Sequence, residues 1–103
     1  MWNDSMKMLK SFVPDMLENK YPDQCPECGS LDRHVFIYRF DEDDDGGLWM
    51  WCSKCHNYTH AHIVVPVGWR NPDFIDEDRL EDSVEYLEER KHEIDKWVNS
   101  LEK

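Results

Sequence analysis

The sequence predicts an α+β fold, in which a three-stranded antiparallel sheet is flanked by an N-terminal helix and a long acidic C-terminal helix. Three observations support this prediction. Runs of β-branched and aromatic residues surround a glycine-containing turn, apolar residues recur at helical spacing in both flanks, and the four cysteines form two short pairs. The 103 residues are expected to form a single domain with segments 1–20, 24–65 and 76–103.

The first segment is predicted to be helical over residues 2–20, in one or two pieces. Proline is unfavourable in a helix interior, so a kink or a restart is expected at Pro14. The apolar face of this segment is expected to pack on the rest of the protein, and a methionine-lined groove for a partner is the alternative. Its residues at helical spacing are Trp2, Met6, Leu9 and Val13.

Three strands are predicted in the central segment, at residues 34–40, 48–52 and 58–65. An acidic tip, residues 41–47, joins the first two strands and is rich in turn-forming residues. Its acids match the first half of a calcium-binding loop. The twelfth position of that loop would be Cys52, where calcium requires a bidentate glutamate, so a solvated acidic turn is predicted instead.

The two cysteine pairs are the strongest chemical signal in the chain. Two residues separate Cys25 from Cys28, and two separate Cys52 from Cys55. Two such pairs can complete a tetrahedron of thiolates around one structural zinc ion. Disulfides are the alternative, but the N-terminus lacks the pattern of a signal peptide. A redox function is also weighed, although it usually requires one such pair beside a βαβ pattern.

The residues around these pairs resemble a zinc ribbon. The resemblance is carried by Cys25-Pro-Glu-Cys28-Gly, the hairpin, and Cys52-Ser-Lys-Cys55, over residues of about 24–65. It implies two cysteine turns that clamp one zinc ion beside a small antiparallel sheet. In the first turn, Gly29 permits a positive φ. The resemblance implies no particular function, because zinc ribbons serve transcription factors, ribosomal proteins, enzymes and adaptors.

The final segment, from about Asp76, is predicted to be the longest helix. Its apolar residues alternate four and three positions apart, which forms a heptad seam interrupted by Lys91. The seam is expected to cover the chain's own sheet. A coiled-coil dimer is the alternative, but two lysines would then meet at the centre of the seam, so a monomer is favoured. The seam consists of Leu80, Val84, Leu87, Lys91, Ile94, Val98 and Leu101.

The charge of the chain restricts its partners. The formal net charge is −11, and binding through phosphates requires a basic surface, so direct DNA or RNA binding is disfavoured. A protein partner with a basic surface is favoured, because opposite potentials steer association. The longest apolar run, residues 63–67, is too short to cross a membrane. Four thiols committed to a metal favour the cytoplasm.

The candidate partner surface combines acids with two tryptophans. Trp49 and Trp51 are candidate apolar anchors, because tryptophan often dominates binding energy at protein interfaces. For most aromatic residues of the sheet, however, packing in a core under the helices is the favoured expectation. The candidate acids are Asp41 to Asp45 (among them Asp43, Asp44 and Asp45), Glu81, Glu85, Glu88 and Asp95.

No enzyme motif is present, and four thiolates leave zinc no open position for water. A second metal site or a catalytic site at His34, His60 and His62 is possible, but ordinary surface histidines are favoured. The sequence therefore favours a non-catalytic, zinc-stabilised protein-binding module, and the charge suggests an inhibitor or immunity-type protein that occupies a basic partner surface. The alternatives are an accessory factor associated with nucleic acid through other proteins and, less favoured, a small metal-dependent enzyme.

Overall fold

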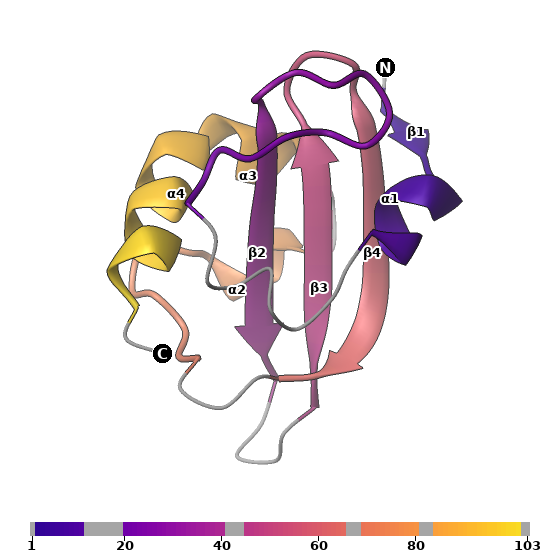
Figure 1. The fold of residues 1–103 in the computed structure, drawn as a ribbon. Coiled ribbons are helices and arrows are strands. Elements are labelled where there is room, and N and C mark those ends of the chain that lie inside the picture. Colours follow the sequence, from indigo (N-terminus) through magenta and orange to yellow (C-terminus); the bar gives the residue numbers. More distant parts are fainter. Residues whose placement is uncertain (1, 12–19, 41–44, 66–68, 81–83, 102–103) are drawn as a thin grey trace.

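The computed structural model describes residues 2–11, 20–40, 45–65, 69–80 and 84–101. Their secondary structure is α+β, as predicted (Figure 1). The elements in chain order are β1 (Asn3–Asp4), α1 (Met6–Lys10), β2 (Arg33–Arg39), β3 (Asp45–Cys52), β4 (Asn57–Val64), α2 (Glu77–Leu80), α3 (Val84–Glu89) and α4 (Lys91–Ser100).

Strands β2, β3 and β4 form the predicted antiparallel sheet, with bounds close to those expected. The prediction of only three strands is wrong, however. A fourth strand, β1, pairs in parallel with β4, so that the sheet is mixed and has the order β1-β4-β3-β2. Residues 41–44 of the predicted acidic tip lie outside the described residues, and residues 45–47 belong to β3 rather than to a turn.

The strand β1 also corrects the predicted N-terminal helix. The backbone N–H groups of Asn3 and Ser5 donate to the carbonyls of His56 and Tyr58, each at 2.8 Å. Pairing with the edge of β4 therefore overrides the helical pattern in the first residues. Helix α1 begins only at Met6, where the Ser5 hydroxyl accepts the N–H of Met8 at 3.0 Å and acts as the N-cap. Residues 12–19, including the predicted kink, lie outside the described residues.

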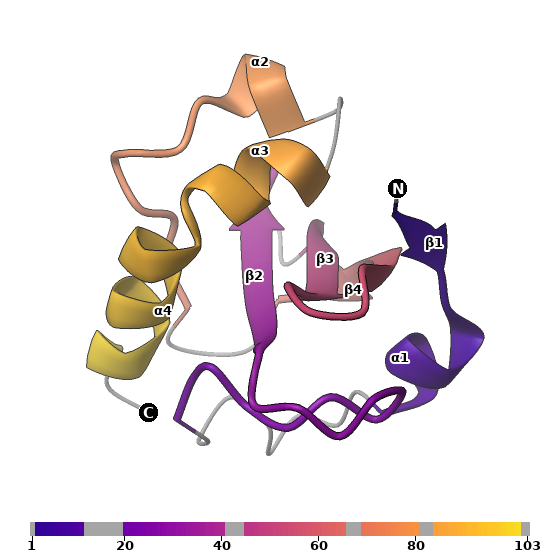
Figure 2. The ribbon, with the colours of Figure 1, turned by 90° about the horizontal axis from the view of Figure 1, so that it is seen from above.

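Both faces of the sheet are covered (Figures 1 and 2). Helices α2 and α3 lie behind β2 in Figure 1, whereas α1 lies in front of β4, and Figure 2 shows the sheet between these two groups. On one face, the side chains of His34 and Trp51 form hydrogen bonds with α4 and α3. On the opposite face, the side chain of Arg33 forms hydrogen bonds with Ser11 and Asp23. Because both faces are covered there, β2 and β3 are buried along nearly their whole length.

The predicted C-terminal helix is not continuous. Residues 81–83, between α2 and α3, lie outside the described residues. Arg90, which follows the last residue of α3, separates α3 from α4, because its φ of −104° and ψ of 9° depart from helical geometry. The turn tightens there because the N–H of Arg90 bonds to the carbonyl of Leu87 at 3.0 Å. The predicted packing of the seam within the chain is seen in its apolar residues, which are all buried, while Lys91 is half-buried.

Candidate metal centre

The four cysteines converge at one end of the sheet. Their sulfurs all lie within 4.8 Å of one another and form a group that could hold a metal ion. The Sγ atoms of Cys25 and Cys55 are 3.7 Å apart, as are those of Cys28 and Cys52. In a tetrahedron with zinc–sulfur bonds of about 2.3 Å, neighbouring sulfurs lie about 3.8 Å apart. The sulfur spacing therefore fits one metal ion bound by four thiolates. None of the cysteines forms a disulfide.

Two turns of similar geometry present these sulfurs. In the first turn, the N–H of Gly29 bonds to the carbonyl of Cys25 at 2.9 Å, and in the second, the N–H of His56 bonds to the carbonyl of Cys52 at 3.0 Å. The residue after the second thiol has a positive φ in both turns, 78° at Gly29 and 61° at His56. Glycine adopts this conformation without strain and histidine does not. The role of Gly29 agrees with the sequence prediction, whereas that of His56 has no sequence signal.

The environment of the sulfurs differs from one to the next. Burial raises the pKa of the Cys25 thiol to about 12. Cys28 is exposed, and hydrogen bonds from the Ser30 hydroxyl and backbone lower the pKa of its thiol to about 6. Burial also raises the pKa of Cys55. The buried thiols therefore need a nearby cation in order to lose their protons at neutral pH, and a divalent metal would supply that charge.

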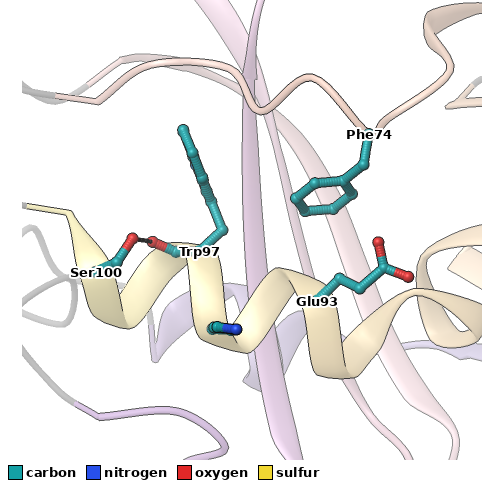
Figure 3. A pocket seen from close by; sticks show the side chains of 5 residues that line it. Phe74, Glu93, Trp97 and Ser100 are labelled. Carbon is teal, nitrogen blue, oxygen red and sulfur yellow. Dashed lines mark hydrogen bonds between the residues drawn. The ribbon is translucent and has the colours of Figure 1, made fainter.

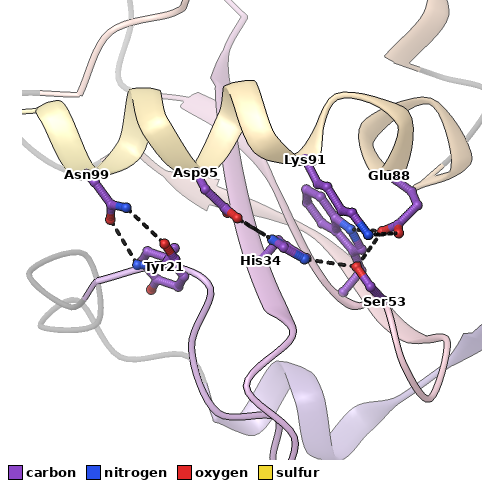
Figure 4. A network of polar contacts seen from close by, with 8 residues as sticks. Tyr21, His34, Ser53, Glu88, Lys91, Asp95 and Asn99 are labelled. Atoms are coloured by element: carbon purple, nitrogen blue, oxygen red, sulfur yellow. Dashed lines mark hydrogen bonds and ion pairs between the residues drawn. The ribbon is translucent and has the colours of Figure 1, made fainter.

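A buried polar network connects the second cysteine turn to the C-terminal helices (Figure 4). Ser53, which follows Cys52, lies 2.9 Å from Nε2 of His34, and Nδ1 of His34 lies 2.8 Å from a carboxylate oxygen of Asp95 on α4. Ser53 also donates to Oε2 of Glu88 on α3 at 2.8 Å. One serine therefore joins the metal turn, strand β2 and both helices.

Glu88 is the second centre of this network. Besides Ser53, its carboxylate accepts the indole N–H of Trp51 and the ammonium of Lys91, each at 2.9 Å. Burial would raise the pKa of this carboxyl, but the hydrogen bonds from Lys91, Ser53 and Trp51 together hold it below its ordinary value. Glu88 is therefore a half-buried anion whose hydrogen bonds to Trp51 and Ser53 hold α3 on the sheet.

The order Ser53, His34, Asp95 resembles that of a nucleophilic triad, but the protons are placed differently. In a nucleophilic triad, the serine donates its proton to a neutral histidine. Here the contact between Ser53 and the Glu88 carboxylate requires the serine proton, because a carboxylate can only accept. The Ser53 proton is thus directed to Glu88, and the His34 ring lies between the Ser53 hydroxyl and the Asp95 carboxylate, where it joins the second cysteine turn to α4.

The first cysteine turn is also tied to α4. The side chain of Asn99 accepts the backbone N–H of Tyr21 and donates to its carbonyl, both at 2.9 Å (Figure 4). Tyr21 lies four positions before Cys25 in the chain. The C-terminal helices therefore contact the second cysteine turn directly, through Ser53, and also contact the segment that leads into the first turn, through Tyr21.

The structure corrects part of the predicted partner surface. Trp49 and Trp51 are 4% and 0% exposed, so neither ring is presented to a partner. Both rings lie on the sheet face that carries His34, where Trp51 donates to Glu88 of α3 and Trp49 lies against Phe36 and His60. Glu88 and Asp95 are engaged inside the chain, whereas Asp45 and Glu85 are exposed. The remaining candidates, Asp43, Asp44 and Glu81, lie outside the described residues.

The three histidines considered for a second site do not come together as metal ligands. His34 is buried in the network, while His60 is exposed and stacks on Trp49 with ring centroids 4.2 Å apart. His62 is exposed on β4. Within the described ranges, the four cysteines are the only group of His, Cys, Asp and Glu placed to share a metal ion.

Sequence reasoning missed Ser53 altogether and placed Glu88 and Asp95 on the surface. Their partners are distant in the chain: His34 and Asp95 are 61 positions apart, and Ser53 and Glu88 are 35 positions apart. One signal was available, since Glu88 and Asp95 lie one position from the seam residues Leu87 and Ile94 and therefore border the buried face.

No model of a known protein family, no curated protein and no solved structure matches the chain. The four-cysteine cluster is consistent with a zinc-ribbon-like site, but family membership is not established. Among the described helices, none has the length and apolar character needed to cross a bilayer.

Proposed function

We propose that the protein is a non-catalytic module in which one zinc ion, held by Cys25, Cys28, Cys52 and Cys55, stabilises an acidic surface that binds a basic protein. Zinc is the metal of choice for four thiolates in a closed tetrahedral site. Such a site has no position for a reacting water, so the metal acts by holding the fold. The observation that carries the proposal is the convergence of the four sulfurs within 4.8 Å.

The binding surface is assigned to the outer sides of α2, α3 and α4. Glu85, Glu89 and Glu93 are exposed there, as are Asp76 and Asp78 at α2. With a net charge of −11, the chain attracts basic surfaces and repels phosphates. An inhibitor that occupies the basic cleft of a nucleic-acid-binding protein has this charge distribution, and we favour that type of partner.

Elemental analysis tests the metal. Protein purified without added metal is expected to contain one zinc per chain, and Cys52→Ser is expected to lose the zinc and to unfold, because metal binding is a large part of the folding free energy of so small a domain. Lys54→Ser, a substitution in the same turn at an exposed residue that is not a ligand, is the control. A cysteine variant that keeps a native circular dichroism spectrum and melting temperature would contradict the structural role.

A capture experiment tests the binding surface. A basic partner isolated on the zinc-loaded protein is expected to associate more slowly as salt increases. The double variant Glu85→Gln/Glu89→Gln is expected to lower the association rate by about tenfold. An Asp4→Asn/Glu27→Gln variant, with the same charge change at exposed residues outside α2, α3 and α4, is expected to have a smaller effect. Tight binding of DNA or RNA at physiological salt would favour the nucleic-acid alternative and contradict the proposal.

A further inference from the structure

A shallow cavity of about 310 Å³ lies between α4 and the segment that precedes α2 (Figure 3). Trp97 and Glu93 project from α4, and Phe74 projects toward the helix from the facing segment. The cavity is therefore a slot with an aromatic side chain on each wall and a carboxylate nearby. Its lining residues are Phe74, Glu93, Lys96, Trp97 and Ser100.

Contacts on both sides hold the wall that carries Phe74. Before it, Trp69 donates its indole N–H to the carbonyl of Ile37 on β2 at 2.7 Å. After it, the backbone N–H of Asp76 donates to the hydroxyl of Tyr86 on α3 at 2.7 Å. The segment is thus attached to the sheet and to α3, so the slot is preformed, and binding does not have to order this wall.

The opposite wall, Trp97, already contacts a cationic side chain of the same chain. The guanidinium of Arg70 lies 5.3 Å from the centroid of the Trp97 ring, and the indole N–H of Trp97 donates to the Arg70 carbonyl at 3.2 Å. Aromatic faces attract guanidinium and ammonium groups through the ring quadrupole. Arg70 is not among the residues that line the slot, so Phe74 and the slot side of Trp97 are available to a further group.

Glu93 supplies a negative charge at this position. One of its carboxylate oxygens, Oε1, lies 3.5 Å from a guanidinium nitrogen of Arg90, and the other makes no hydrogen bond within the described part of the chain. The ammonium of Lys96 is the opposing charge. Both side chains are exposed, so water screens each of them, and the aromatic walls decide which ligand is preferred.

We propose that the slot between Phe74 and Trp97 binds a cationic side chain of a protein partner, arginine in the first place, with Glu93 as its counter-charge. The planar guanidinium fits between two aromatic walls and can donate to a carboxylate at the same time. The negative charge of the whole chain brings basic partners to this surface. The inference rests on the proposed function and identifies where one residue of the partner binds.

A titration with short peptides tests the slot without the partner. Zinc-loaded, ¹⁵N-labelled protein is titrated with a capped tripeptide that has arginine at its centre, and the resonances of the Trp97 indole and the α4 amides are followed. Saturable shifts with an affinity of about millimolar are expected. The matching citrulline peptide has nearly the same shape but no charge, and it is expected to bind about tenfold more weakly. A lysine peptide compares ammonium with guanidinium.

Four variants separate the slot from the overall charge. Glu93→Gln and Phe74→Leu are each expected to weaken binding about threefold, and Lys96→Gln is expected to strengthen it. Glu89→Gln removes the same charge from an exposed position outside the slot and is the matched control. The melting temperature of each variant shows whether the fold is retained.

Several outcomes would overturn the inference. Absence of shifts at the slot, or equal binding of the arginine and citrulline peptides, would show that no cation is bound there. Equal weakening by Glu89→Gln and Glu93→Gln would assign the effect to diffuse charge. If the basic partner is lost from Glu85→Gln/Glu89→Gln but retained by Glu93→Gln and Phe74→Leu, the slot is wrong while the proposed function stands. If the arginine peptide binds but no basic partner does, the proposed function fails while the slot stands.

Discussion

Each cysteine turn depends on one residue in the left-handed conformation, and the two turns use different residue types for it. Gly29 adopts this conformation at little cost, whereas His56 adopts it with strain. The ring of His56 lies 4.7 Å from that of Trp2, and this contact offsets part of the strain. The second turn is therefore supported by the N-terminal segment, while the first is supported by its glycine.

Substitution of Gly29 tests the first turn. A Cβ at this position would meet no heavy atom within 4 Å, so backbone strain alone opposes it. Gly29→Ala is expected to lower the free energy of unfolding by about 1 kcal/mol, measured by urea denaturation of the zinc-loaded protein. His56→Gly relieves the same strain but loses the contact with Trp2, so a smaller change is expected. An unchanged stability of Gly29→Ala would show that the turn does not require a positive φ.

At the scale of the elements, the C-terminal helices are joined to the metal turns by buried polar contacts. Ser53 contacts Glu88 of α3, and Asn99 of α4 contacts the backbone of Tyr21. Because each partner is at least half-buried, the loss of one leaves another poorly satisfied, and this costs stability. The network therefore fixes where α3 and α4 lie on the sheet, in addition to the apolar seam.

Glu88→Gln tests this network. A glutamine offers one acceptor oxygen to three donors, so we expect a loss of about 1–2 kcal/mol of unfolding free energy at pH 7. Glu89→Gln, at an exposed neighbour, is expected to have little effect. Urea denaturation of the three zinc-loaded proteins measures the difference.

The pH dependence of that loss has a definite sign. The pKa of Glu88 in the folded protein lies below its ordinary value of 4.5. The stabilisation by the carboxylate is therefore fully present above pH 4.5 and is lost as the pH falls through the folded value. The difference between wild type and Glu88→Gln is expected to shrink over this range, and a constant difference would show that the charge of Glu88 is not responsible.

At the scale of the whole molecule, the metal centre and the helical layer form one unit. The cysteines lie at the end of the sheet to which the helices are bonded, and the buried apolar residues form one cluster that runs from Met8 to Leu101. A domain of this size has little stability to spare, so loss of one part is expected to affect the other.

Removal of zinc with a chelator tests this coupling. The buried amides of α4, such as those of Ile94 and Val98, are expected to lose protection from hydrogen exchange together with those of β2 and β3. Zinc added back in excess is expected to restore both. If α4 and the sheet keep their protection without the metal, the ion stabilises only the cysteine turns.

The sequence was sufficient for features that depend on local spacing. The ligand set follows from the two cysteine pairs, and strands β2, β3 and β4 follow from short runs of β-branched and aromatic residues. These signals extend over a few residues, so no knowledge of the rest of the fold was needed. The predicted N-terminal helix failed at its start because Asn3 and Ser5 pair with β4, about 55 positions away in the chain.

The tertiary structure alone decided which polar residues are buried. The sequence placed Glu88 and Asp95 with the surface acids. Docking of α3 and α4 instead brings Glu88 to the indole of Trp51 and Asp95 to the ring of His34. Composition cannot distinguish a solvated carboxylate from a buried one, because the difference lies in a partner that the chain brings from up to 61 residues away. The sequence thus determined the metal ligands and most of the sheet, and long-range packing determined the network that holds the helices and the slot at Trp97.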